Sequence, residues 1–120
     1  GQIDYLDLSL WDCFNAPNDP AYAHAPLIDH FTSLPRGATR LGVAGKIMDA
    51  ATAQRCIDHG ADFVLIGRGA ILHPDFATRA IADPAFRSVE RPVTSAYLRA
   101  RAIGPAFVDY LRTWKGFVSD

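Results

Sequence analysis

Three short stretches of the chain have the hydrophobic pattern of β-strands, and each precedes a segment with helical character. The first, residues 3–10, alternates apolar and polar side chains, which is the period of a strand with two unlike faces. The third, residues 63–66, is a run of four large apolar residues, as in a strand buried on both faces. In chain order, we predict a strand at 3–10, a helix at 25–34, a strand at 40–44, a helix at 49–59, a strand at 63–66, a helical turn at 70–72 and a helix at 75–81.

The central predicted helix has recognisable signals at both ends. Asp49 has a side chain of the type that caps helix N-termini, and Gly60 lies where a glycine commonly ends a helix. The helical period predicts that Ala53, Cys56 and Ile57 face the core.

The turns that follow the second and third predicted strands have the chemistry of an anion site. Gly67 gives the backbone room to turn and approach a ligand, and Arg68 adds a forked cation suited to phosphate. Gly45 and Lys46 form the equivalent turn one strand earlier. Because strand–helix loops at the carboxyl end of a parallel sheet often hold a phosphate, we predict one shared phosphate site. The alternative is a pair of tight connections with solvated cations.

The alternation of strands and helices with short connections predicts a parallel α/β sheet with right-handed crossovers. Two phosphate-type turns at successive strand ends favour a (β/α) barrel, and a doubly wound sheet is the alternative. No G-x-G-x-x-G motif occurs at a predicted strand–helix turn, which argues against a dinucleotide-binding sheet.

The chain changes character after residue 82, and we divide it there into a partial barrel, residues 1–82, and a helical tail, residues 83–120, that packs on it. A helix is predicted over 94–103, ended by Gly104, and Pro105 opens a last helix. In this last helix four apolar side chains recur at helical spacing and are predicted to pack against the core or a partner: Phe107, Tyr110, Leu111 and Trp114.

Composition narrows the class of protein further. The 120 residues are 49% hydrophobic with a net charge of −1, which excludes a disordered chain and gives no electrostatic reason to expect nucleic acid or an anionic membrane as partner. Cys13 and Cys56 lack the spacing of a metal site, and we expect reduced thiols and a cytoplasmic location. No apolar run approaches the roughly 20 residues of a membrane span, and no charged-then-apolar leader is visible.

Other residue types with possible chemistry have a structural interpretation. The four histidines have no identifiable acid or metal partner, and a metal site is not predicted: His24, His30, His59 and His73. Asp4 and Asp7 point to opposite sides of their strand, and Cys13 has no activating neighbour. Trp11 and Asp12, at the end of the first strand, are better placed to border a substrate pocket, and of the two we assign Trp11 to it.

These motifs together resemble a known family. Val43-Ala44-Gly45-Lys46-Ile47, the run from Gly60 to Ala70, and His73-Pro74-Asp75-Phe76 are similar to the C-terminal part of old yellow enzyme-type NADH:flavin oxidoreductases. Residues 3–11 look like the sixth strand of that family's barrel, and residues 92–94 and 106–118 resemble the tail of one bacterial branch. The resemblance extends over nearly the whole chain.

The resemblance implies a TIM (β/α)8 barrel that binds FMN at its mouth, with this chain as the last three strand–helix units and the tail. By resemblance, Gly45, Lys46, Gly67 and Arg68 would hold the FMN phosphate. Three parallel strands cannot close a barrel and leave unpaired edges. We therefore expect self-association or pairing with the missing barrel part, the chain being a truncated, proteolysed or split portion of a longer enzyme.

The activity implied is that of an ene-reductase, in which NAD(P)H reduces FMN and the flavin passes hydride to an activated alkene or enone. The family's catalytic residues lie on earlier strands, so none is assigned in this chain, and the 120 residues alone are expected to be inactive. Two alternatives stay open: another phosphate-binding (β/α) barrel enzyme, or a non-catalytic half-barrel module that binds a phosphate or a partner chain.

Overall fold

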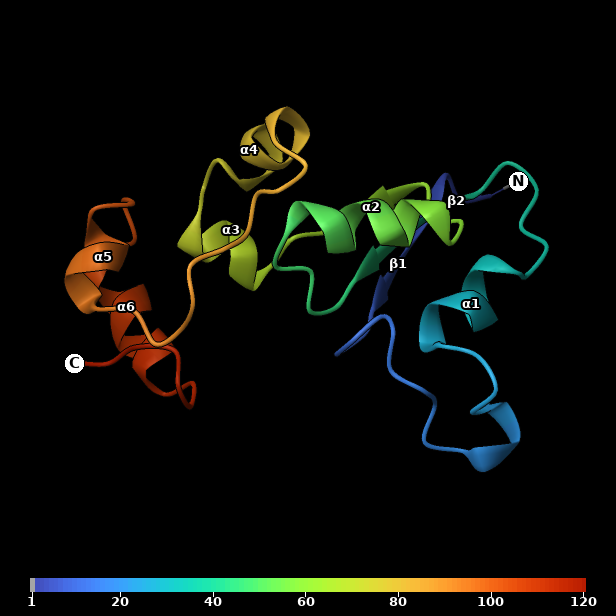
Figure 1. The fold of residues 1–120 in the computed structure, drawn as a ribbon, viewed down its shortest axis with the longest axis horizontal. Helices are drawn as coiled ribbons and strands as arrows, with labels where there is room; N and C mark the ends of the chain where they lie inside the picture. Colours follow the sequence, from blue (N-terminus) through green and yellow to red (C-terminus); the bar gives the residue numbers. More distant parts are fainter. Residues whose placement is uncertain (1) are drawn as a thin grey trace.

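The computed structural model describes residues 2–120 and contains one three-stranded parallel sheet, in the order β1-β2-β3. The predicted α/β class is confirmed. In Figure 1 the sheet lies with α1 and α2 at one end of the molecule, α5 and α6 lie at the other end, and α3 and α4 lie between them. The elements are β1 Tyr5–Ser9, η1 Pro20–Tyr22, α1 Leu27–Thr32, β2 Arg40–Ala44, α2 Ala50–Asp58, β3 Phe63–Val64, α3 Arg68–Leu72, α4 Phe76–Ala82, α5 Ser95–Arg99 and α6 Pro105–Arg112.

The strand β2 is the middle of the sheet. It pairs with β1 over five residues, from Tyr5↔Arg40 to Ser9↔Ala44. The pairing with β3 is shorter, although the Leu65 N–H also donates to the Val43 carbonyl at 2.9 Å. Residues 63–66 are half-buried, where we predicted a buried strand, because β3 has a neighbouring strand on one side only.

The main core fills the space between the sheet and the helices α1 and α2. Val43 of β2, Ile28 of α1 and Cys56 of α2 are each fully buried there. The predicted cap is confirmed, because the Asp49 side chain accepts a hydrogen bond from the Thr52 N–H at 2.6 Å. The other buried members of this cluster are Cys13, Ile47 and Ala61.

Two predicted helices differ from the observed ones. In α2, Ile57 is 40% exposed rather than buried, because it lies about 100° around the helix from Cys56 and so off the stripe that faces the sheet. The first helix, α1, is shorter than the predicted 25–34, with Pro26 as its N-cap. Gly60 does end α2 as predicted, with a φ of +105°.

The tail packs around its own cluster together with residues of α3. Leu72 of α3 is fully buried with Leu98, Val108, Leu111 and Phe117 of the tail. Val93 completes the buried set of this cluster.

Hydrogen bonds join the end of the chain to α5. Both carboxylate oxygens of Asp120 accept bonds from Ser95, at 2.6 Å from its N–H and 2.9 Å from its hydroxyl. These bonds lower the pKa of the Asp120 carboxyl. These hydrogen bonds hold Asp120 against the start of α5.

The observed tail helices correct two predictions. The helix α5 ends at Arg99 and not near residue 103, because Ala102 takes a left-handed conformation with a φ of +62°, and Gly104 is the N-cap of α6. The apolar stripe of α6 is only partly buried. Leu111 is inaccessible, whereas Phe107 and Tyr110 are 40% and 53% exposed, because the packed face of α6 runs through Val108 and Leu111.

The second face of the sheet is open. Tyr5 of β1 and Phe63 of β3 meet edge to face above Gly42, with ring centroids 5.6 Å apart. A side chain at Gly42 would collide with the Phe63 ring. Tyr5 remains 58% exposed, so this aromatic pair forms an uncovered apolar surface.

Candidate functional site

The carboxyl ends of β1, β2 and β3 border a single cleft of about 420 Å³. Parallel α/β sheets commonly bind ligands at the carboxyl ends of their strands, which is the position of this cleft. It brings together all five residues predicted from the sequence: Trp11, Gly45, Lys46, Gly67 and Arg68. The other lining residues are Ser9, Leu10, Ala44, Ile47, Met48, Leu65 and Arg91.

The turn after β2 is shaped by its contact with the end of β1. Gly45 and Lys46 have φ values of +153° and +56°, and a Cβ at Gly45 would collide with the Leu10 carbonyl. The Leu10 N–H donates to the Ala44 carbonyl at 2.7 Å, which holds the two segments together. The close approach of Leu10 is therefore by itself enough to require glycine at position 45.

Lys46 lines the cleft, and its ammonium group forms a weak ion pair. Its Nζ lies 3.6 Å from Oδ2 of Asp12, and the Lys46 side chain is 69% exposed. The other Asp12 oxygen accepts a bond from the Phe14 N–H at 3.0 Å. Exposed pairs of this kind contribute at most about 1 kcal/mol, so the ammonium is available to an incoming anion.

In the turn after β3, the backbone at Gly67 has free space beside it and the Arg68 guanidinium lies near two aromatic rings. The helix α3 begins at Arg68, slightly earlier than the predicted start near Ala70, and a Cβ at Gly67 would meet no atom within 4 Å. The Arg68 guanidinium lies 5.5 Å from the Trp11 ring and 5.7 Å from the Trp114 ring. Within residues 2–120 its side chain makes no hydrogen bond or ion pair, so the rings orient a cation whose N–H groups face no protein acceptor.

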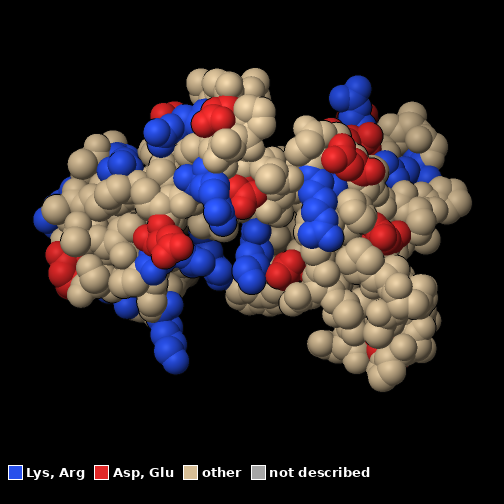
Figure 2. Space-filling model, in the orientation of Figure 1, with Lys and Arg blue, Asp and Glu red and all other residues tan. Residues whose placement is uncertain are grey.

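The charge of the cleft is one-sided. Among the residues that line it, Lys46, Arg68 and Arg91 are cationic, and none is an aspartate or glutamate. Figure 2 shows Lys and Arg side chains along the hollow between the tail and the sheet. The arrangement favours a small, multiply charged anion over a neutral or cationic ligand.

Arg91 is the charged lining residue that we did not predict. It belongs to the tail, more than 20 residues beyond the turn after β3, and no local pattern of the sequence connects it with the strand ends. Only the packing of the tail against α3 brings it to the cleft.

Asp62 is a second residue whose role the sequence did not reveal. Its carboxylate accepts bonds from the Leu41 N–H at 2.8 Å and from Arg36 at 3.2 Å, and both lower its pKa. Arg36 also donates to the carbonyls of Gly60 and Thr32, at 2.9 Å each. This network lies at the amino ends of β2 and β3, opposite the cleft, and fixes how the two strands begin.

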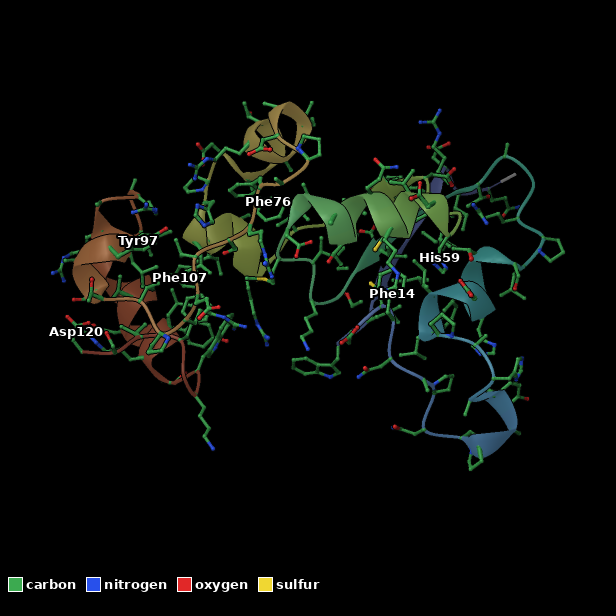
Figure 3. The ribbon with its side chains drawn as sticks, viewed as in Figure 1. Phe14, His59, Phe76, Tyr97, Phe107 and Asp120 are labelled. Atoms are coloured by element: carbon green, nitrogen blue, oxygen red, sulfur yellow. The ribbon has the colours of Figure 1, made fainter. Side chains whose placement is uncertain are left out.

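No histidine lines the cleft in the described part of the chain. His59 lies at the end of α2 with its Nδ1 2.7 Å from a carboxylate oxygen of Asp29, and its ring packs edge to face on Phe14 (Figure 3). His30 contacts the Tyr22 carbonyl at 2.8 Å. Asp29 is an acid partner for His59 that we did not predict, but neither residue lines the cleft. These contacts hold α1 against its neighbours, which is a structural role.

His73 is buried at the turn between α3 and α4. Its Nε2 accepts a hydrogen bond from the Val89 N–H at 3.0 Å, and its backbone N–H donates to the Gly69 carbonyl at 2.8 Å. Burial, together with the nearby Arg79 cation, lowers the pKa of the imidazole, so His73 favours its neutral form. Its contacts are those of a residue that shapes a turn.

The two cysteines are inert. Cys13 and Cys56 are free thiols that are both fully buried in the main core cluster. Burial raises the pKa of Cys13, and burial together with the neighbouring Cys13 raises the pKa of Cys56 to about 12. Neither thiol is therefore a nucleophile or a metal ligand at neutral pH.

Within residues 2–120, no group of three or more His, Cys, Asp or Glu side chains is placed to hold a metal ion. None of the helices in this part of the chain has the length and apolar character needed to cross a membrane. Comparison of the chain with known protein families, curated proteins and solved structures found no match.

Proposed function

We propose that this chain is part of an FMN-dependent NAD(P)H oxidoreductase of the old yellow enzyme type, and that its cleft binds the FMN phosphate. One observation carries the proposal: the turns Gly45-Lys46 and Gly67-Arg68, on successive parallel strands, border the same cleft with cations and no carboxylate. Phosphate groups bind at this position in many (β/α) barrels.

The residues of the cleft fit a phosphate group. Arg68 offers guanidinium N–H groups that no protein acceptor within residues 2–120 uses, and Lys46 adds a second charge that only a weak ion pair occupies. The open space at Gly67 gives a phosphate oxygen access to the backbone of the turn. A phosphate monoester carries a charge of about −1.5 to −2 at neutral pH, which matches this set of donors.

In the proposed enzyme, the residues of this chain bind the FMN phosphate and orient the cofactor. When bound, FMN supplies hydride transfer from NAD(P)H to an activated alkene or enone. Lys46 and Arg68 hold the phosphate, and the turns at Gly45 and Gly67 set its distance from the strand ends. Trp11, which is 84% exposed at the rim of the cleft, borders the substrate pocket. No catalytic residue is assigned to this chain.

We infer that further parallel strands complete a TIM barrel around this sheet. Both β1 and β3 are edge strands, and the open face above Gly42 carries the uncovered pair Tyr5 and Phe63. Ile3 precedes β1, and Leu6 lies in β1 on the opposite face from Tyr5; they are 55% and 44% exposed. Exposed apolar side chains and unpaired strand edges are stabilised when another segment covers and pairs with them. The remaining barrel strands would do so, and in their absence we expect association between copies of the chain.

The protein expressed from its complete gene tests the proposal. We expect a yellow product with bound FMN that NAD(P)H reduces without air and that cyclohexenone reoxidises, because both half-reactions need the flavin held in place. The 120-residue chain alone should not reduce cyclohexenone. A colourless product that binds a sugar phosphate tightly would instead indicate another phosphate-binding barrel enzyme, and one that binds neither would indicate a non-catalytic module.

A further inference from the structure

We propose that Arg91 of the tail is a third cationic residue of the phosphate site, so that the tail takes part in binding and not only in packing. Arg91 lines the same cleft as Lys46 and Arg68, although it lies in the segment between α4 and α5. The inference rests on the proposed function in one respect, namely that the ligand of the cleft carries a phosphate monoester.

Charge matching favours such a residue. A phosphate monoester carries nearly two negative charges, and Lys46 shares its charge with Asp12 in a weak ion pair at 3.6 Å. Of the two cations already assigned to the site, only Arg68 is without an acidic partner within residues 2–120. Arg91 supplies the second uncompensated cation, because within residues 2–120 its side chain makes no ion pair or hydrogen bond.

The Arg91 side chain is oriented by an aromatic ring. Its guanidinium lies 5.6 Å from the centre of the Phe117 ring, and Phe117 is itself 1% exposed and fixed in the tail cluster. Arg68 has the same kind of support from Trp114, whose ring packs edge to face on Phe117 at 5.4 Å. Linked aromatic side chains of the tail thus hold both guanidinium groups of the cleft.

The backbone around Arg91 is fastened on both sides. The Ser88 N–H donates to the carbonyl of Met48, itself a lining residue of the cleft, at 2.8 Å. On the other side, the Val93 N–H donates to the Phe117 carbonyl at 3.0 Å and the Val93 carbonyl accepts from Ser119 at 2.9 Å. Backbone hydrogen bonds on both sides therefore hold Arg91 in place. Because the segment is already ordered, the entropic cost of binding an anion is lower.

Titration of FMN, riboflavin and inorganic phosphate into matched variants tests the inference. We expect Arg91→Ala to weaken FMN and phosphate binding about ten- to hundredfold, as for the loss of a charged hydrogen bond, and to leave riboflavin binding unchanged. Arg91→Lys should recover part of the loss. Arg99→Ala is the matched control, because Arg99 is an exposed cation of α5 that does not line the cleft.

The outcomes separate this inference from the proposed function. If Arg68→Ala weakens FMN binding and Arg91→Ala does not, the inference is wrong while the proposed phosphate site stands. If the unaltered protein binds FMN no better than riboflavin but Arg91→Ala weakens binding of inorganic phosphate, the anion site stands and the flavin assignment is wrong. If the unaltered protein binds neither FMN nor phosphate, both are wrong.

Discussion

Replacing Gly45 with alanine should destabilise the protein by about 2–5 kcal/mol, the combined cost of overpacking and of backbone strain. The new Cβ would collide with the Leu10 carbonyl, and the backbone at this position has a φ of +153°. Relief of the collision requires the end of β1 to move away from the turn after β2, which would also distort the cleft. Urea unfolding followed by circular dichroism measures the loss.

Gly67→Ala is the matched control for this prediction. At Gly67 the φ is −93° and no atom lies within 4 Å of the added Cβ, so we expect a loss of less than about 1 kcal/mol, the usual effect at an N-cap. The same variant should weaken FMN binding, because the methyl group would occupy space that the phosphate uses. Equal destabilisation by the two substitutions would contradict the different roles that the structure assigns to the two glycines.

Phe117→Ala should cost about 3–5 kcal/mol, the range for truncating a buried phenylalanine. The ring is 1% exposed and packs with Leu72 of α3 and with Leu111 of α6, so its removal leaves a cavity where the tail meets the rest of the chain. It also removes the ring beneath Arg91, and FMN affinity should fall along with stability.

Phe107→Ala provides the comparison within the same tail. Phe107 is 40% exposed and stacks on Tyr110, with ring centroids 5.9 Å apart, so its truncation should cost less than about 1 kcal/mol. Thermal unfolding of both variants gives the comparison. A Phe107 effect as large as that of Phe117 would show that the exposed face of α6 is covered in solution.

Local signals in the sequence were enough to place the sheet and its connections. The strand predicted at 40–44 appears with the same bounds as β2. Asp49 and Gly60 mark the ends of α2 through chemistry that involves only their immediate neighbours. Because parallel strands bring their carboxyl ends to one edge, the meeting of the two glycine turns in one cleft could also be predicted.

The features that could not be predicted depend on contacts between distant segments. The exposure of Ile57, Phe107 and Tyr110 depends on which neighbours cover each helix, and helical periodicity alone does not identify the covered flank. The place of Arg91 in the cleft depends on how the tail packs against α3. Asp62 has its role through Leu41, 21 positions earlier, a pairing that no spacing rule indicates.

The relative affinity of the protein for FMN and riboflavin tests the central claim most directly, because the two ligands differ only in the phosphate. We predict that FMN binds at least about tenfold more tightly and that Arg68→Ala removes most of this preference without changing riboflavin affinity. Fluorescence titration of the product of the complete gene, freed of any bound flavin, gives all four dissociation constants. Equal affinity for the two flavins, or a preference that survives Arg68→Ala, would contradict a phosphate site at the turns after β2 and β3.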